Sequence, residues 1–346
     1  MRASILIRNY NGLELLANLL PGLTQVVSKR GEGDEVLVVD DGSTDGSPRF
    51  VEQRFPGVRL VRLSPNSGNS ILPVNAGVEA ASAEVVICLD SDVIVDSDFI
   101  TPMIGHFKDD SVFAVCPRIV NPGHGNTVES VNYPLFRRGR LVGMVPGMEQ
   151  GAVLPGEPTE VWYAPGSGAG YHRQRFLEMG GLDILYRPFY YEDLDICQRA
   201  WRRGWRTIYE PRAVTYHLKH VTTKKSILRP IDFRTYRMKN ILLFTWKNLL
   251  DRHLMRRHLA WTGLSLARAL LTVDRAYLTA FLMAVRQLQE ALAARRRERK
   301  GMLVDDRTIF SRLSAIHSNG YENQGVSGTV ESLKRTYADA GISGCL

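Results

Sequence analysis

The stretch Val85-Val86-Ile87-Cys88-Leu89-Asp90-Ser91-Asp92 indicates the fold class of this 346-residue chain. Five apolar residues in succession are typical of a strand that is buried on both faces, as strands of parallel sheets are. Further apolar runs at 5–7, 36–39 and 58–63 alternate with helical patterns at 13–27, 50–55 and 74–81. This alternation predicts an α/β fold: a nucleotide-binding-like, mostly parallel sheet flanked by helices.

Polar residues follow each of the four predicted strands. The strands run into Arg8-Asn9-Tyr10-Asn11-Gly12, Asp40-Asp41-Gly42, Asn66-Ser67-Gly68 and Asp90-Ser91-Asp92, in chain order. In open α/β sheets, ligands bind outside the carboxyl ends of the strands. We therefore expect a binding site along this one edge of the sheet.

The pair Asp90 and Asp92 is the candidate metal site. Carboxylate oxygens suit Mg²⁺ or Mn²⁺, and such a cation would bind a diphosphate and neutralise its charge. An Asp-x-Asp that merely solvates a loop is the alternative. Asp40 ends its strand where it could accept a hydrogen bond from a base or a ribose, and Tyr10 could stack on a base or form part of the rim.

A second acidic group, Glu192-Asp193, precedes a predicted helix at 193–203. Acidic residues are favoured at a helix start by the helix dipole, so plain capping is one interpretation. The other is a general base that accepts a proton from an attacking hydroxyl. His217 follows a short predicted strand at 213–216, and it gains interest only if that strand ends beside Asp92.

Composition and charge bound the class of protein. The 44% hydrophobic and 23% charged residues are ordinary for a globular protein with a core. Residues 1–110 hold 9 Lys/Arg and 16 Asp/Glu, whereas the remainder holds 35 and 20. The acidic part could hold a cation, and the basic part could meet phosphates or an anionic membrane surface.

The cysteines and the ends of the chain point to a cytoplasmic protein. The four cysteines show no metal-site spacing and no paired framework. We see no signal peptide, and the uncharged apolar run 276–285 is too short to span a bilayer. We therefore expect a cytoplasmic location, with the inner face of the plasma membrane as the other option.

The chain divides into predicted parts. We expect a catalytic domain over 1–230, with Pro/Gly-rich loops at 117–165, then amphipathic helices over 231–300 that end in a basic run at 295–300, and a weakly packed tail over 301–346. The helices at 232–300 would either contact a membrane surface or pack on the catalytic domain or form a dimer.

Taken in order, these motifs resemble the inverting family 2 glycosyltransferases with the GT-A fold, over roughly residues 3–250. The resemblance also uses Asn75-Ala76-Gly77, Gly180-Gly181-Leu182-Asp183, the segment 211–217 and Arg237-Met238-Lys239-Asn240. It implies a sugar transfer from a nucleoside-diphosphate sugar, UDP- or dTDP-linked, to a glycan or lipid-linked acceptor. The setting would be the synthesis of cell-surface polysaccharide, lipid-linked glycan or glycolipid.

The resemblance also implies roles for parts of the chain and for residues. Residues 1–110 would bind the nucleotide sugar, and residues 111–230 would supply the acceptor side and the catalytic group. Asp92, Asp90 and His217 would hold Mn²⁺ or Mg²⁺, and Asp193, next to Glu192, would be the base. The nucleotide sugar would be bound by Arg8, Asn9, Tyr10, Asp40, Asn66, Gly68, Asn75, Asp90 and Ser91. Gly168, Ala169 and Asp183 would border the acceptor.

Two departures and two alternatives accompany this interpretation. Many members of the family carry a basic residue near Pro73-Val74, which is absent here, so Arg8 is the candidate phosphate contact. The Gln-x-x-Arg-Trp of processive synthases is also absent. A sugar-nucleotide nucleotidyltransferase would favour a Gly-rich phosphate loop after the first strand. A non-catalytic basic protein that binds membranes or nucleic acid is the second alternative, although we expect no nucleic-acid partner.

Overall fold

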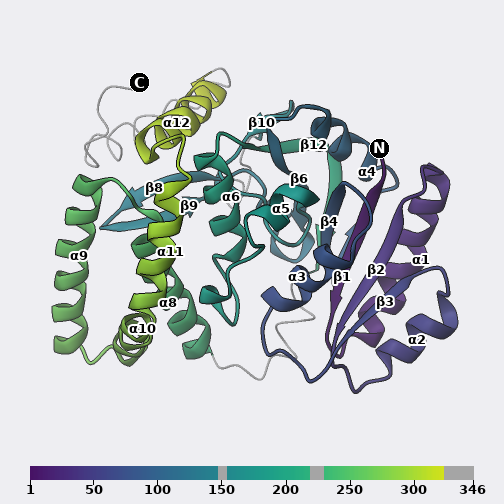
Figure 1. Ribbon diagram of the computed structural model, residues 1–346, viewed down its shortest axis with the longest axis horizontal. Helices are drawn as coiled ribbons and strands as arrows, with labels where there is room; N and C mark the ends of the chain where they lie inside the picture. Colours follow the sequence, from purple (N-terminus) through teal and green to yellow (C-terminus); the bar gives the residue numbers. More distant parts are fainter. Residues whose placement is uncertain (147–153, 219–229, 323–346) are drawn as a thin grey trace.

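The computed structural model describes residues 1–146, 154–218 and 230–322. One large mixed sheet forms the centre, and helices cover both of its faces (Figure 1). None of the helices in the described parts of the chain combines the length and apolarity needed to cross a lipid bilayer.

The sheet begins as the sequence predicts. Its strand order is β10-β12-β6-β11-β4-β1-β2-β3, and β3, β2, β1 and β4 are parallel neighbours. These strands are β1 (Ala3–Asn9), β2 (Glu35–Asp41), β3 (Arg59–Leu63) and β4 (Val85–Asp90). The helices between them are α1 (Leu13–Arg30), α2 (Ser47–Arg54) and α3 (Ile71–Ala80). The predicted α/β class is therefore confirmed.

Alternate residues of the central strands feed two separate cores. Leu6 of β1 packs with α3 on one face of the sheet, whereas Ile5 and Ile7 pack with α1 on the other. Side chains of a strand point alternately to its two faces, so a continuous apolar run is what a sheet covered on both sides requires.

The middle of the chain is more regular than the sequence suggests. Instead of only long loops at 117–165, the structure has β6 (Val112–Asn121), β7 (Thr127–Val128), the hairpin β8 (Tyr133–Arg137) and β9 (Arg140–Met144), and β10 (Thr159–Glu160). The expectation was wrong there because Gly and Pro mark turns without revealing strands that find distant partners. Other elements of this part are β5 (Val93–Val95), α4 (Ile100–Gly105), η1 (His106–Lys108), η2 (Pro122–His124), β11 (Gly170–His172), α5 (Arg173–Glu178) and η4 (Ile184–Tyr186).

Two further elements, α6 and β12, follow this middle part of the chain. Helix α6 (Glu192–Arg202) matches the helix predicted at 193–203. The short strand expected at 213–216 is the end of a longer strand, β12 (Arg206–His217), which has a register shift between Glu210 and Val214. Pro211 lies in that irregular stretch, since proline cannot donate a ladder hydrogen bond.

The C-terminal helices are α8 (Pro230–Asn248), α9 (Arg252–Leu271), α10 (Arg275–Arg286), α11 (Leu288–Lys300) and α12 (Asp306–Glu322). Leu242, Leu243 and Phe244 of α8 belong to the same core as β4 and α6. Helix α8 therefore packs on the sheet domain, which is one of the arrangements left open by the sequence. The division of the chain into domains at residue 230 stays a prediction.

The expected weak packing after residue 301 is wrong for the start of that segment. Ile309, Phe310 and Leu313 of α12 are buried in the main core. Asp306 accepts from Arg202 Nη2 at 2.8 Å, so the helix start is also held by a buried ion pair. The polar composition concealed a few apolar residues at helical spacing. Residues 323–346 lie outside the described parts.

Candidate active site

The strand register brings the predicted site residues together at one edge of the sheet. Arg8 of β1 lies opposite Asp90 of β4, and Asn9 lies opposite Asp40 of β2. The Arg8 guanidinium donates to Asp90 through Nε, and Nη1 reaches the Ser70 carbonyl at 3.5 Å. Burial opposes the charge of the guanidinium, but Asp90 outweighs it and raises the pKa of Arg8.

Asn9 and Asp40 lie side by side at the ends of β1 and β2, where the nucleoside is predicted to bind. Asn9 Nδ2 donates to Asp40 Oδ1 at 2.9 Å, and the Ser43 N–H donates to Asp40 Oδ2 at 3.0 Å. Both side chains are buried, whereas Tyr10 next to them is exposed. An exposed ring beside fixed polar groups is an arrangement that can accept a base by stacking.

The loop after β3 is held by the second aspartate of β2. Asp41 accepts from Asn66 Nδ2 at 3.0 Å and from the Ser67 N–H at 2.9 Å. Gly68 has a φ of +67°, a left-handed conformation that favours glycine. Asp41 thereby orients the Asn66–Gly68 loop beside the strand ends, a role that the sequence did not separate from that of Asp40.

Asn75 is placed differently from its prediction as a nucleotide-sugar contact. Its Nδ2 donates to the Leu182 carbonyl at 2.9 Å, and its Oδ1 accepts from the Leu182 N–H at 2.8 Å. Both ends of the amide are therefore used to fasten the turn at Gly181-Leu182. The motif remains, but this side chain serves the fold.

Asp90, Asp92 and His217 gather as one group of candidate metal ligands. One ligating atom from each lies within 4.8 Å of the others. His217 Nε2 is 3.4 Å from Asp92 Oδ1 and 3.9 Å from Asp90 Oδ2. The pairing of β12 with β5 places His217 opposite Val93, directly after Asp92. Ser91 lies against Gly12 of the first loop.

Glu129, between β7 and β8, is a site residue that the sequence did not reveal. Its Oε1 lies 3.1 Å from His217 Nδ1 and accepts from Ser167 Oγ at 3.2 Å. A histidine that donates Nδ1–H to a carboxylate presents Nε2 to a metal, a common arrangement around bound metals. Residues 92, 129 and 217 are far apart in sequence, so no local pattern points to this contact.

The acidic pair at the start of α6 has the electrostatics of a base. Burial and the neighbouring charge of Glu192 raise the pKa of Asp193 to about 7, although N–H groups of Leu194 and Gly166 favour its charged form. Burial also raises the pKa of Glu192, whose Oε1 accepts from Ser70 Oγ at 2.8 Å. A carboxylate with a pKa near 7 is suited to general-base catalysis at neutral pH.

Two series of contacts connect the acidic pair Glu192-Asp193 with the candidate metal ligands. On one side, Ser70 links Glu192 to Arg8, which binds Asp90. On the other side, Asp193 Oδ2 accepts from the Gly166 N–H at 3.3 Å, and Ser167 continues to Glu129 and His217. The predicted catalytic and metal-binding residues thus belong to one network of contacts.

The turn before α6 is held in an uncommon conformation. Tyr190 and Tyr191 have φ values of 74° and 79°, in the left-handed region that non-glycine residues rarely adopt. Asn240 of α8 compensates, since its Nδ2 lies within hydrogen-bond distance of the carbonyls of Tyr186, Phe189 and Tyr190. Helix α8 therefore fixes the backbone that presents Glu192 and Asp193.

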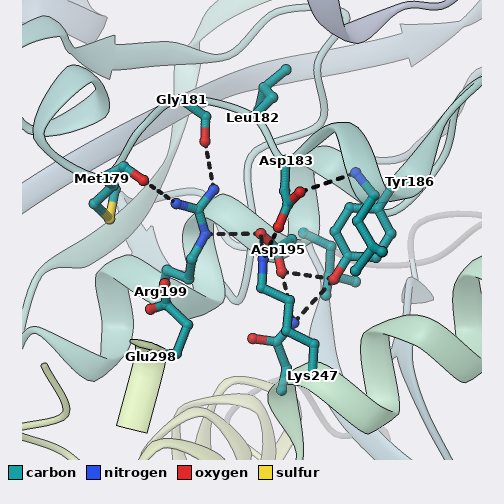
Figure 2. A network of polar contacts seen from close by, with 12 residues as sticks. Met179, Gly181, Leu182, Asp183, Tyr186, Asp195, Arg199, Lys247 and Glu298 are labelled. Atoms are coloured by element: carbon teal, nitrogen blue, oxygen red, sulfur yellow. Dashed lines mark hydrogen bonds and ion pairs between the residues drawn. The ribbon is translucent and has the colours of Figure 1, made fainter. Parts of the chain in front are cut away.

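A buried ionic network holds α6 in place through Asp195, two residues after Asp193 (Figure 2). Asp195 accepts from Lys247 Nζ at 2.7 Å and from Arg199 Nε at 2.8 Å. Burial alone would raise the pKa of Asp195, but Lys247 and Arg199 hold it well below its usual range. Asp183, expected to border the acceptor, accepts from the same Lys247 at 2.7 Å, so its carboxylate belongs to this network.

In the glycine-rich segment 166–170, the first two residues contact the candidate site and the next two are buried in the core. Gly166 and Ser167 reach Asp193 and Glu129, as described. Ala169 is fully buried in the core, and Gly168 is buried against Pro117. That these two residues border the acceptor stays a prediction. The segment leads into β11, where alternate residues must face the core.

The fold and this site define a glycosyltransferase domain of the GT-A type. The chain belongs to glycosyl transferase family 2, whose family model matches residues 4–176. This membership favours the transferase interpretation over the nucleotidyltransferase and the non-catalytic alternatives.

Relatives in Mycobacterium tuberculosis share part of the sequence. The chain is 31% identical over 213 residues to a pre-mycofactocin glycosyltransferase, covering 60% of this chain and 40% of that protein. It is 27% identical over 258 residues to an N-acetylglucosaminyl-diphospho-decaprenol L-rhamnosyltransferase, covering 66% of this chain and 78% of that protein. The chain thus spans less than half the length of the first of these relatives.

Solved structures share the fold. S. aureus TarS 1-349 in complex with UDP-GlcNAc matches with a TM-score of 0.53 and 17% identity, covering 97% of this chain and 92% of that one. GalNAc-T7 with UDP, GalNAc and Mn²⁺ matches with a TM-score of 0.55 and 17% identity, covering 71% of this chain and 48% of that one.

The donor set fits a hard divalent cation. Two carboxylates and an imidazole suit Mn²⁺ or Mg²⁺ better than a soft, thiolate-bound metal. Asp92 is buried, and its carboxylate and that of Asp90 both lie within 4 Å of His217 Nε2. A cation there would replace the histidine as the charge that balances the two carboxylates.

Proposed function

We propose that this chain transfers a sugar, with inversion, from a nucleoside-diphosphate sugar to a hydroxyl of a glycan or lipid-linked acceptor. The observation that carries the proposal is Asp193, a carboxylate whose pKa of about 7 suits a base, joined by contacts to the Asp90, Asp92 and His217 group. Membership of glycosyl transferase family 2 supports the reaction class.

The donor binds along the strand ends in this proposal. Tyr10 stacks on the base, Asp40 faces the nucleoside, and the Asn66–Gly68 loop closes that side. Asp92, Asp90 and His217 would hold Mn²⁺ or Mg²⁺, which when bound supplies positive charge beside the departing diphosphate. Arg8 adds a fixed cation next to them. The similar structures solved with UDP-GlcNAc and with UDP, GalNAc and Mn²⁺ support a UDP-linked donor, and a dTDP-linked donor is the alternative.

Asp193 accepts the proton of the acceptor hydroxyl as that oxygen bonds to the anomeric carbon. The carbon–oxygen bond to the diphosphate breaks on the opposite face, so the configuration inverts. Glu192 keeps the pKa of Asp193 high enough for it to act as a base, and Asn240 and the Asp195 network hold α6 in place. Orientation of this kind is a large part of catalysis by enzymes.

The acceptor is proposed to be part of cell-surface polysaccharide, lipid-linked glycan or glycolipid synthesis, on the cytoplasmic side of a membrane. The name of the M. tuberculosis rhamnosyltransferase refers to a diphospho-decaprenol compound, which supports a lipid-linked acceptor for a member of this family.

One experiment tests the function. The purified chain is mixed with Mn²⁺ or Mg²⁺ and a panel of nucleotide sugars, and release of nucleoside diphosphate and thermal shifts are measured. We expect metal-dependent release for one donor class. No release, together with no thermal shift for any nucleoside diphosphate plus metal, would contradict the proposal.

Three variants assign the roles. Asp92→Asn should abolish metal-dependent donor binding. Asp193→Asn should still bind the donor but lose transfer by about 10²–10⁴-fold, the usual contribution of a general base. The exposed Asp98→Asn is the matched control and should behave like the wild type. Full transfer by Asp193→Asn would mean that the base is another group.

A further inference from the structure

Helix α9 carries an apolar surface that the described parts of the chain leave uncovered. It stands at the edge of the molecule farthest from α1 and α2 (Figure 1). One side packs inward through Leu254 and through His258, which accepts from Trp246 Nε1 at 2.9 Å. On the other side, Leu259 and Leu264 are exposed.

The exposure is greatest where α9 turns into α10. Leu270, Leu271 and Val273 are 63%, 86% and 65% exposed. We name residues 268–275 the α9–α10 corner; its first and last residues are the exposed arginines Arg268 and Arg275. Large apolar side chains this exposed in a cluster mark an interaction surface rather than ordinary surface.

Charge decides which occupant fits this surface. Residues 252–289 contain six arginines and one acidic residue, Asp274. Asp274 is already paired with Arg234 Nη2 at 2.5 Å. A second copy of the same surface would bring arginines to arginines with no free carboxylate, whereas an anionic lipid surface supplies phosphates for the arginines and an apolar layer for the leucines.

Helices α8 and α11 of the segment 232–300 are docked within the fold. Leu242 and Phe244 of α8 are in the core. In the basic run at 295–300, Arg295 donates to the carbonyls of Trp246 and Leu249, and Glu298 pairs with Arg203 at 2.9 Å. The sequence suggested that this run attracts a membrane, but its first arginine is used to dock α11 on α8.

The corner lies at the same end of the molecule as the active site. In Figure 1, β1 runs from the N-terminus at the top to its carboxyl end at the bottom, where the site residues follow it. Helix α10 and the end of α9 also lie at the bottom of this view. A surface that touches the corner would therefore face the end of the molecule where the proposed acceptor must enter.

We propose that the α9–α10 corner inserts into the interfacial layer of an anionic lipid bilayer, with Leu270, Leu271 and Val273 among the acyl chains and Arg268 and Arg275 at the phosphates. This rests on the proposed function only in giving the contact a purpose, the capture of a lipid-linked acceptor. No step of the transfer chemistry depends on it.

Flotation with lipid vesicles tests the proposal with the full chain. The protein should float with phosphatidylcholine vesicles that contain phosphatidylglycerol, and less with phosphatidylcholine alone. Leu270→Ser/Leu271→Ser should weaken binding by about tenfold or more, since each buried leucine contributes strongly. Each of Arg268→Gln and Arg275→Gln should weaken binding about fivefold, and only to the anionic vesicles.

Leu303→Ser is the matched control, because Leu303 is 80% exposed but lies between α11 and α12 at the opposite end. It should bind vesicles like the wild type. Absence of wild-type binding, or equal binding by the double leucine variant, overturns the proposal. The proposal is also overturned if the wild type does not bind vesicles but forms a concentration-dependent dimer in light scattering, and the double leucine variant does not form this dimer.

The membrane proposal and the proposed transferase function can be tested independently of each other. The double leucine variant should keep wild-type donor binding and wild-type release of nucleoside diphosphate in solution. Loss of vesicle binding with intact release would concern the corner alone, and loss of release with intact vesicle binding would concern the active site alone.

Discussion

Asp193 and Glu192 share one buried negative environment at the start of α6, and in the proposed mechanism this sets the pH at which Asp193 acts as a base. Asp193 must be deprotonated to accept a proton, and its pKa is raised to about 7. Activity should therefore rise as pH increases through about 7. A kcat/KM profile against pH reports this pKa of the free enzyme.

Glu192→Gln should move that acid limb to lower pH by about one pH unit, because removal of a neighbouring negative charge favours the charged form of Asp193. The measurement is kcat/KM from pH 5 to pH 9 for both proteins, with the exposed Glu290→Gln as control. An unchanged limb in Glu192→Gln would show that another group titrates.

Glu129 should control metal affinity through His217. Glu129→Gln keeps the size of the side chain but weakens the contact with His217 Nδ1, which is 3.1 Å away. We expect about 10–100-fold weaker Mn²⁺ binding, as for other residues that orient metal ligands. Electron paramagnetic resonance of free Mn²⁺ measures this without turnover.

The exposed Glu84, at the other end of β4, provides the matched control as Glu84→Gln. Equal Mn²⁺ affinity in Glu129→Gln and wild type would mean that Glu129 does not belong to the metal site.

Asp90 and Asp92 could be predicted from the sequence because both follow one apolar strand. Glu129 could not, since its partner is 88 residues away and its neighbours are turn residues.

At the scale of elements, α6 depends on charges from α8. Lys247 and Arg199 both donate to the buried Asp195, and Lys247 also reaches Asp183 in the turn before η4 (Figure 2). The sequence motif at 191–195 predicted the helix and the base. It did not predict Lys247, because a lone lysine in an amphipathic pattern is expected to face solvent.

Asp195→Asn should lower the free energy of unfolding by about 3–5 kcal/mol, since it leaves two buried cations short of a partner. Chemical denaturation measures it. The depressed pKa means that Asp195 contributes stability above its unfolded pKa of about 3.9, and this contribution is lost as pH falls.

The difference between wild type and Asp195→Asn should therefore be full at pH 7 and shrink in acid. Glu290→Gln, on the exposed side of α11, should leave stability within about 0.5 kcal/mol of the wild type. A pH-independent difference would mean that the charge of Asp195 is not what stabilises α6.

At the scale of the molecule, the C-terminal helices complete the core of the sheet domain. Phe310 of α12 packs edge-on against Trp162, with ring centroids 6.4 Å apart, and Trp162 contacts Phe244 of α8 in the same way. Residues from three distant parts of the chain thus share one aromatic cluster. We infer that the described chain up to α12 unfolds as a unit.

Phe310→Ala should lower the free energy of unfolding by about 3–5 kcal/mol, the usual cost of such a cavity. Leu303→Ala, a few residues earlier but exposed, should change it little. A single cooperative transition that shifts for Phe310→Ala alone, in circular dichroism, is the expected result. Similar stability of both variants would mean that α12 does not belong to the core.

Patterns along the chain were enough to predict the parallel strands of the first 90 residues, the polar residues at the strand ends, and the neighbouring carboxylates Asp90 and Asp92. These follow from periodicity and from the rule that strand ends meet at one edge. The tertiary structure alone decided the partners, such as Glu129 for His217, Lys247 for Asp195 and Leu182 for Asn75. A buried polar group must find a partner wherever the fold brings one, so those pairings depend on long-range packing that spacing along the chain does not record.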